Sequence, residues 1–242
     1  YIDYVQNSFD ITGPSAGDGS LRINSDRSIR IEDHSIKAAN GQTLQIELNP
    51  FNAAEAAGGA VILDNATLKS GGQQPTSGAT ADINLGNFTN ADGDDFAVGF
   101  EADAESIHDG VRISNSVIDT RGSDGDGTLT IAGRAPTTAQ SGAGVRITGA
   151  TTQLQSGTGS ILIDGEVTEP ASSGNKDGVI IGEGGAAQVT MKATSGNIRI
   201  RGDASGVGDS VTGGSRYDGL VITSGALIGT DSGDILLIGR GG

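Results

Sequence analysis

The chain of 242 residues contains 41 glycines, five phenylalanines and three tyrosines, and it has no tryptophan and no cysteine. Such a composition gives a thin, aliphatic core, which disfavours a conventional enzyme, and the lack of cysteine excludes disulfides and thiolate metal sites. Asp and Glu number 30 against 15 Lys and Arg, and the net charge of −15 repels phosphate backbones and anionic lipid, so we expect no nucleic-acid partner.

The chain starts with Tyr1-Ile2-Asp3-Tyr4, which has neither an initiator methionine nor the pattern of a signal peptide. No apolar run approaches the ~18 residues of a membrane-spanning helix, so we expect no membrane insertion. We interpret the chain as an interior fragment of a longer protein.

Residues 1–58 carry short segments in which aliphatic and polar residues alternate. Residues 20–23, 28–31 and 43–48 alternate in this way, with Ile36 between the last two. Alternation is the period of a strand with one buried face. We expect these residues to form the first one or two coils of a repeat structure.

Residues 59–109 depart most from a regular pattern. Gly59 opens a Gly-Ala-Val-Ile-Leu segment, and residues 81–85 form a second alternating segment. Residues 71–78 are rich in Gly, Gln, Ser and Pro, and three of the five phenylalanines follow: Phe88, Phe96 and Phe100. We expect one coil with long loop insertions.

Residues 110–242 hold two glycine motifs that repeat together. Gly-Val-x-Ile begins at Gly110, Gly144 and Gly178 and recurs as Gly-Leu-Val-Ile at Gly219, at intervals of 34, 34 and 41 residues. In the second motif two glycines six positions apart flank alternating aliphatic residues, and a short apolar patch lies between the motifs. The second motif begins at Gly127, Gly159, Gly196 and Gly233, and the patches are residues 117–118, 153–154, 189–191 and 227–228.

Each repeat therefore predicts three short strands joined by corners of Gly, Asn, Asp and Ser. Stacked at a spacing of ~4.8 Å, such strands form an all-β solenoid, a right-handed parallel β-helix with three short parallel sheets. A β-sandwich is the alternative, but loops of unequal length and the absence of an Asn-Gly hairpin rhythm count against it. We expect inward side chains at Leu129, Ile131, Ile161, Ile163, Ile198 and Ile200 and outward ones at Arg199 and Arg201.

Three runs carry a family resemblance. Residues 19–29 read Gly-Ser-Leu-x-Ile-x-Ser-Asp-Arg-x-Ile, residues 39–49 Ala-Asn-Gly-Gln-x-Leu-x-Ile-x-Leu-Asn, and residues 59–72 Gly-Ala-Val-x-Leu-x-Asn-Ala-x-Leu-x-Ser-Gly-Gly. They resemble repeats of the filamentous haemagglutinin-like exoproteins of two-partner secretion systems, and the later glycine motifs look like the same family. The resemblance covers essentially the whole chain.

This resemblance implies a bacterial protein that is secreted or held at the cell surface, exported through an outer-membrane β-barrel transporter partner. It implies an adhesin stalk in cell adhesion and virulence, with a host or bacterial cell-surface glycan or protein as ligand, or the stalk of a contact-dependent toxin-delivery protein. The family's secretion domain carries Asn-Pro motifs. Here only Asn49-Pro50-Phe51 is present, which we interpret as chance, so the chain is expected to lie downstream of that domain.

Loops are the expected place for binding, because connecting segments carry variation on a rigid scaffold. Residues 134–143, 166–177 and 203–218 follow the second glycine motif in successive repeats and should stack along one edge. In the third loop, Arg216 and Tyr217 are the candidate ligand-binding residues, for a sugar or a peptide. An ordinary solvated loop is the alternative interpretation.

A carbohydrate-active enzyme, either a polysaccharide lyase or a glycoside hydrolase, is the alternative function, because such enzymes need carboxylates close together on an exposed face. Asp119, Arg121, Asp124 and Asp126 are near one another in sequence, but an acidic chain places such neighbours in solvated corners, and we assign no catalytic residue. Residues 90–95 and 124–126 cluster oxygen ligands without completing a calcium motif, and His34 and His108 are far apart in sequence. We predict no cofactor and no metal.

Overall fold

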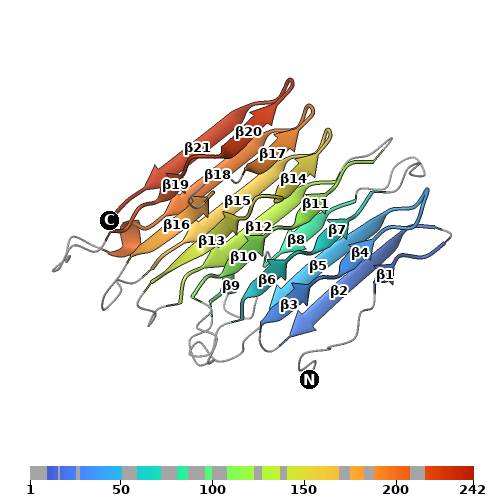
Figure 1. Cartoon of the computed structure of the whole chain (residues 1–242), viewed down its shortest axis with the longest axis horizontal. Coiled ribbons are helices and arrows are strands. Elements are labelled where there is room, and N and C mark those ends of the chain that lie inside the picture. Colours follow the sequence, from blue (N-terminus) through green and yellow to red (C-terminus); the bar gives the residue numbers. More distant parts are fainter. Residues whose placement is uncertain are drawn as a thin grey trace.

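The computed structural model describes residues 10–15, 17–25, 28–50, 59–71, 81–86, 96–99, 108–122, 127–136, 141–168, 175–182, 188–207 and 216–242. These residues form β-strands and one 3-10 turn, η1 (Ser205–Val207), and no α-helix is present among them. Every pair of neighbouring strands is parallel, and the strands make three sheets, A, B and C (Figure 1).

Sheet A has seven strands and sheet C has six. In stacking order, sheet A consists of β1 (Ile11–Thr12), β4 (Ser35–Lys37), β7 (Thr67–Lys69), β11 (Val117–Asp119), β14 (Gln153–Ser156), β17 (Val189–Ala193) and β20 (Ala226–Thr230). Sheet C consists of β3 (Ile29–Glu32), β6 (Val61–Asp64), β10 (Val111–Ser114), β13 (Gly142–Thr148), β16 (Lys176–Ile181) and β19 (Leu220–Ile222).

Sheet B has eight strands, seven of them in one path and β9 (Ala97–Val98) paired beside β12. Its path runs through β2 (Gly19–Ser25), β5 (Leu44–Pro50), β8 (Ile83–Leu85), β12 (Leu129–Arg134), β15 (Ile161–Glu166), β18 (Ile198–Asp203) and β21 (Ile235–Arg240).

The chain visits sheets C, A and B in turn, so each circuit is one coil of a solenoid. Sheet A contributes one strand to each coil, which gives seven coils among the described residues, stacked from β1 to β20. Figure 1 shows the coils side by side, with the first and last at opposite ends of the stack. The prediction of an all-β parallel β-helix with three sheets is confirmed, and the parallel pairing excludes the β-sandwich. The right-handed sense remains a prediction from the crossover rule.

The core is a set of aliphatic columns inside the coils. In sheet B, Leu129, Ile161 and Ile198 stand in one column and are fully buried. The outward residues alternate with them, and Arg199 is exposed while Arg201 is partly buried. The predicted inward and outward faces are therefore confirmed. The short strands β1 and β9 were not predicted, because two residues are too few to show a period.

The corner between sheets C and A needs a left-handed backbone. Asp33, Asn65 and Asn115 have φ of 57°, 51° and 48° at this corner, and Gly149 follows with φ of 93°. Asn and Asp tolerate this region because their short polar side chains bond locally. The Asn65 amide donates to Oδ1 of Asp33 at 2.6 Å, so the corner is also tied from one coil to the next.

Both glycine motifs meet where sheet B passes sheet C. A Cβ atom on Gly202 of β18 would lie 1.7 Å from the carbonyl oxygen of Gly219, and one on Gly165 of β15 would lie 2.1 Å from that of Gly178. Two backbones approach so closely here that no side chain fits. We call this contact the glycine seam, formed by Gly133, Gly165, Gly202 and Gly239 of sheet B against Gly144, Gly178 and Gly219 and their neighbours in sheet C.

Candidate functional site

The three predicted loops leave the ends of β12, β15 and β18 and lead to β13, β16 and β19. These strand ends are in register, since Arg134 pairs with Glu166 and Glu166 with Asp203. The loops therefore start at one edge of the stack, which we call the loop edge. Residues 137–140, 169–174 and 208–215 of these loops lie outside the described residues.

The described flanks of the loops form a small second core. Ala135, Val167, Ala204, Val207 and Tyr217 are buried against one another. Ala135, Val167 and Ala204 each come directly after a sheet B strand, so this cluster extends the inward packing beyond the strand ends. The loop edge is thus held to the solenoid by apolar contacts where it leaves and returns.

The two candidate ligand-binding residues are placed differently. The ring of Tyr217 is buried in the second core and is 7% exposed, so it is a packing residue. The Arg216 side chain is 66% exposed and its Nη2 lies 3.7 Å from a carboxylate oxygen of Asp218. Its backbone N–H donates to Oδ1 of Asn175 at 2.8 Å. Arg216 is therefore the member of the pair that can meet a ligand.

Lys176 is a feature that the sequence did not reveal. Its side chain is fully buried, and its Nζ donates to the carbonyl oxygen of Pro136 at 2.8 Å. A buried ammonium is tolerated where its donors are satisfied. This contact joins the start of one loop to the end of the next along the loop edge. The run Asn175-Lys176-Asp177 reads as solvated loop, which is why its burial was missed.

Ion pairs cover the outer face of sheet B next to the loop edge. Arg134 is 2.9 Å from Glu166 and lies 5.0 Å from the ring centroid of Phe96. Arg201 is 3.0 Å from both Asp164 and Asp203. Burial raises the pKa of Asp164 despite its Arg201 partner, whereas coulombic attraction to Asp164 raises the pKa of Arg201. The face is a network of paired charges rather than a field of one sign.

Arg201, Gly202 and Asp203 form a tripeptide that would offer two opposite charges to a ligand if it lay in an exposed loop, and the repeat pattern did not single it out. Here it lies in β18, with Gly202 in the glycine seam. Asp203 accepts hydrogen bonds from Ser205 N at 3.0 Å and from Arg201 Nη2 at 3.0 Å. Burial raises the pKa of Asp203, but the bonds from Ser205 and Arg201 outweigh it and leave that pKa lowered. All three residues of the tripeptide therefore make contacts within the fold.

Buried aspartates lie just before β10 and at the start of β16 in sheet C. Asp109 accepts from the N–H of Ala143 at 2.9 Å and pairs with Arg146 at 2.9 Å. Asp177, in the same column two coils on, accepts from the N–H of Asp218 at 3.1 Å. Burial raises the pKa of Asp177, which the bond from Asp218 only partly offsets. These carboxylates link consecutive coils.

Of the four residues considered for a carbohydrate-active site, Asp119 and Arg121 lie within the described part of the chain, and they form an ion pair. Asp119 accepts two bonds from the Arg121 guanidinium, both 2.8 Å. Burial raises the pKa of Asp119, but the Arg121 contacts prevail and lower it, which suits an ion pair and not a general acid. Asp124 and Asp126 lie outside the described residues, as do 90–95. His34 and His108 sit in different coils.

The described residues contain no group of three or more His, Cys, Asp or Glu placed to hold a metal ion. No helix among them has the length and apolarity to cross a membrane.

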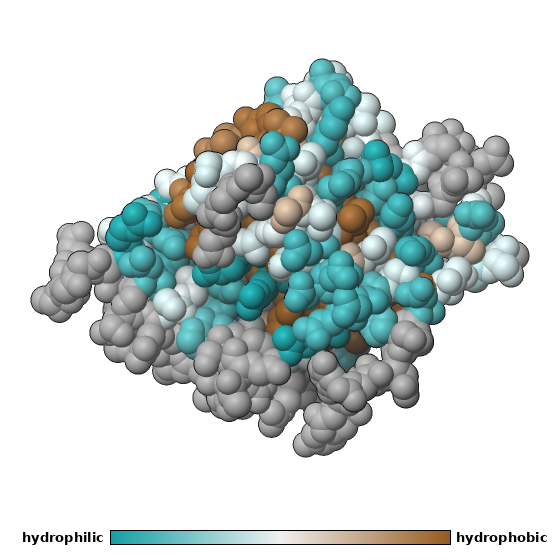
Figure 2. All heavy atoms as spheres, viewed as in Figure 1, coloured by the Kyte–Doolittle hydropathy of each residue, from teal (hydrophilic) through white to brown (hydrophobic). Residues whose placement is uncertain are grey.

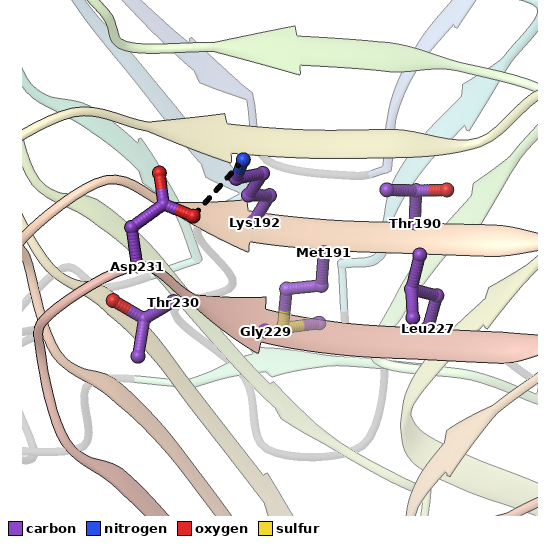
Figure 3. A pocket seen from close by; sticks show the side chains of 7 residues that line it. All are labelled: Thr190, Met191, Lys192, Leu227, Gly229, Thr230 and Asp231. Atoms are coloured by element: carbon purple, nitrogen blue, oxygen red, sulfur yellow. Dashed lines mark ion pairs between the residues drawn. The ribbon is translucent and has the colours of Figure 1, made fainter.

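A shallow groove lies on the outer face of sheet A, between β17 and β20 (Figure 3). The Lys192 ammonium and the Asp231 carboxylate pair at 3.1 Å across it, and Leu227 is 60% exposed at its other end. Gly229 leaves its centre open, with no atom within 4 Å of the place a Cβ would take. The groove is therefore amphipathic but open to solvent. Its lining also includes Thr190, Met191 and Thr230.

Comparisons of the chain with family models, with curated proteins and with solved structures found no match. The class of protein that the described residues define is a three-sheet parallel β-helix.

Proposed function

We propose that this chain is part of the stalk of a secreted bacterial surface exoprotein of the filamentous haemagglutinin type, and that its loop edge binds a cell-surface glycan or protein. The observation that carries the proposal is a continuous stack of seven coils with loops leaving one edge in successive coils. A rod with recognition loops along one side is suited to hold a binding surface away from a cell.

The stack is suited to act as a spacer because, from the coil of β3, β4 and β5 onward, each described coil is tied to the next on all three sheets. A coil adds ~4.8 Å of length, so the seven coils span roughly 30 Å. Aspartate and asparagine side chains add bonds between coils at the corners, as Asp82 does to Thr128 N at 2.8 Å and Asn65 does to Asp33. Such a rod resists bending without disulfides, which fits a chain that has no cysteine.

The loop edge supports binding more than the flat faces do. Next to the loop edge, Arg201 on the outer face of sheet B pairs with Asp164 and its side chain is 29% exposed, whereas the Arg216 side chain at the loop edge is 66% exposed. An exposed guanidinium offers several donors in a fixed plane, which suits carboxylate, sulfate or hydroxyl groups of surface glycans and acidic groups of proteins. Export would pass through the outer-membrane β-barrel partner that the resemblance implies.

Binding and catalysis are tested together. Beads coated with the full chain are incubated with erythrocytes and epithelial cells, and the soluble chain is incubated with pectin, alginate and host glycans. We expect beads to adhere and the polysaccharides to stay intact. Release of reducing ends or unsaturated products that is lost in Asp119→Ala would overturn the stalk proposal in favour of a carbohydrate-active enzyme. Failure of the beads to adhere to any cell would contradict the proposal that the loop edge binds a cell-surface ligand.

A further inference from the structure

The surface of the middle coils offers a ligand mainly polar and charged groups. In the view of Figure 2, hydrophilic residues cover most of the described surface there, and apolar residues form small, separate patches. Positive groups are the scarcer kind, because Lys and Arg number 15 against 30 Asp and Glu. A place where positive groups gather without matching carboxylates therefore points to an anionic ligand.

Three of the four lysines of the chain stand in one outward column of sheet A. Lys37 of β4, Lys69 of β7 and Lys192 of β17 share this column with Asp119 of β11 and Gln155 of β14. All three lysines are exposed. Positive charge is thus gathered on one face of a chain whose net charge is −15.

Lys37 and Lys69 are direct register partners on neighbouring strands, which lie ~4.8 Å apart. Within the described residues, neither ammonium forms an ion pair. Lys37 attracts Asp10 only at longer range, and the Asp10 carboxylate accepts from the N–H of Ser35 at 2.9 Å. Like charges at opposed positions of a sheet destabilise it, so the fold carries repulsion at this pair.

Other like-charged register partners in the described sheets have an opposite charge beside them. Arg112 and Arg146 of sheet C are register partners, and Arg146 pairs with Asp109 at 2.9 Å. Glu166 and Asp203 of sheet B are register partners too, and each pairs with an arginine. The two lysines differ from these pairs, because no described carboxylate neutralises them.

Arg121 extends the positive charge to the next coil. Asp119 continues the column beside Lys69, and the Arg121 guanidinium holds its carboxylate at 2.8 Å. The Arg121 side chain is 51% exposed, so one carboxylate lies among three cations. We call Lys37, Lys69 and Arg121 the cationic patch. It covers three successive coils of sheet A, over roughly 10 Å.

We propose that the cationic patch binds a polyuronate, a linear polysaccharide with a carboxylate on every sugar. Its carboxylates supply the counter-charge that Lys37 and Lys69 lack. A 1,4-linked sugar is about as long as the coil spacing of ~4.8 Å, so successive carboxylates meet successive coils. Thr67 also faces outward on β7, beside Lys69, and its hydroxyl can bond to a sugar hydroxyl. At 0.1 M salt the Debye length of ~10 Å screens the acidic residues farther away.

A single polysaccharide chain suits the patch better than other polyanions do. The patch is one column wide, and a DNA duplex or a membrane extends beyond it and meets the acidic remainder of the chain. Binding of single-stranded nucleic acid uses aromatic side chains on which bases stack. The described strands of sheet A contain no aromatic residue.

Alginate oligomers test the proposal, by fluorescence anisotropy of the labelled sugar at 0.1 M salt with EDTA. We expect alginate to bind and alginate with esterified carboxylates not to bind. Lys37→Gln and Lys69→Gln should each weaken binding about two- to fivefold, and together about tenfold. Lys192→Gln is the matched control, because Lys192 belongs to the same column but pairs with Asp231 at 3.1 Å. It should leave the affinity unchanged.

A chain without affinity for alginate would overturn the proposal, as would equal binding of the esterified oligomer or an equal loss in Lys192→Gln. Vesicles of phosphatidylglycerol and single-stranded DNA are titrated in parallel. Tighter binding to either of them that depends on Lys37 and Lys69 would assign the patch to lipid or nucleic acid instead. The patch is separate from the loop edge, so Arg216→Ala should leave alginate binding unchanged whether or not the loop edge binds cells.

Stability gives a second readout. Alginate should raise the urea midpoint of the unmodified chain and not that of the double variant Lys37→Gln, Lys69→Gln. Without ligand, the double variant should be at least as stable as the unmodified chain, because it removes the repulsion between the two lysines. A double variant that alginate stabilises as much as the unmodified chain would contradict binding at the patch.

Discussion

The glycine seam makes the sharpest prediction about stability. Gly202→Ala places a Cβ 1.7 Å from the Gly219 carbonyl oxygen and 2.5 Å from its carbon, both of them backbone atoms. Ordinary van der Waals contact needs about 3.4 Å, and the atoms in the way belong to backbone, so the two sheets must move apart. We expect Gly202→Ala to lower the free energy of unfolding by about 4 kcal/mol or more. Gly229→Ala meets no atom within 4 Å and should gain about 0.5 kcal/mol, because alanine restricts the unfolded chain.

The assay is urea unfolding followed by circular dichroism, with midpoint and slope compared between variants. Two further seam positions keep the test informative if Gly202→Ala does not fold. A Cβ on Gly165 would lie 2.1 Å from a backbone oxygen, and one on Gly239 would lie 3.2 Å from the Leu220 side chain. We expect the loss to increase from Gly239→Ala through Gly165→Ala to Gly202→Ala. Equal midpoints for Gly202→Ala and Gly229→Ala would refute the close approach.

Three further predictions concern the core and its carboxylates. Ile161→Asp buries an unpaired charge and should cost several kcal/mol in thermal or urea unfolding, whereas Arg199→Ala should change stability by less than about 0.5 kcal/mol; similar losses would refute the inward and outward assignment. The raised pKa of Asp177 means that its ionisation opposes folding, and that stability falls as pH rises from the unfolded pKa of about 3.9 through the folded value. Asp177→Asn keeps an oxygen acceptor, so it should flatten this slope and match or exceed the parent's stability at neutral pH; an unchanged slope would contradict the burial argument. The pKa of Asp203 is lowered in the folded protein, so ionised Asp203 stabilises the fold. This stabilisation is fully present above the unfolded pKa and is lost as pH falls through the lowered folded value. Asp203→Ala should cost about 1–3 kcal/mol at neutral pH and less in acid, measured by melting at both pH values, and a pH-independent loss would count against it.

The fold could be predicted because each coil repeats the same short sequence patterns, and each pattern reports a contact that its own residues make. Alternating aliphatic residues such as Ile198 and Ile200 define which face of a strand is buried. Glycines recur because the seam brings two backbones together once in each coil, as at Gly202. Residues at equivalent positions of successive repeats stack in one column, so the regular spacing of the repeats also predicts which residues contact each other.

The candidate site could be predicted only in part. The position of the loops follows from the repeat, but the burial of Tyr217 depends on Val207 and Ala204, which come from the same loop after it folds back. Lys176 is buried for a similar reason, because its partner is the Pro136 carbonyl of another loop. Contacts between irregular segments have no period in the sequence, so Tyr217, next to Arg216 in a loop, was predicted to lie at the surface.

The central claim, that binding takes place at the loop edge of a stalk, is tested most directly by adhesion of coated beads to cells. Beads carry the unmodified chain, Arg216→Ala or Lys192→Ala. The arginine and lysine side chains are 66% and 55% exposed and each belongs to a surface ion pair, but Arg216 lies at the loop edge and Lys192 in the groove of sheet A. We predict that adhesion falls with Arg216→Ala and persists with Lys192→Ala. Loss of adhesion with Lys192→Ala alone would contradict the claim and move the binding surface to sheet A.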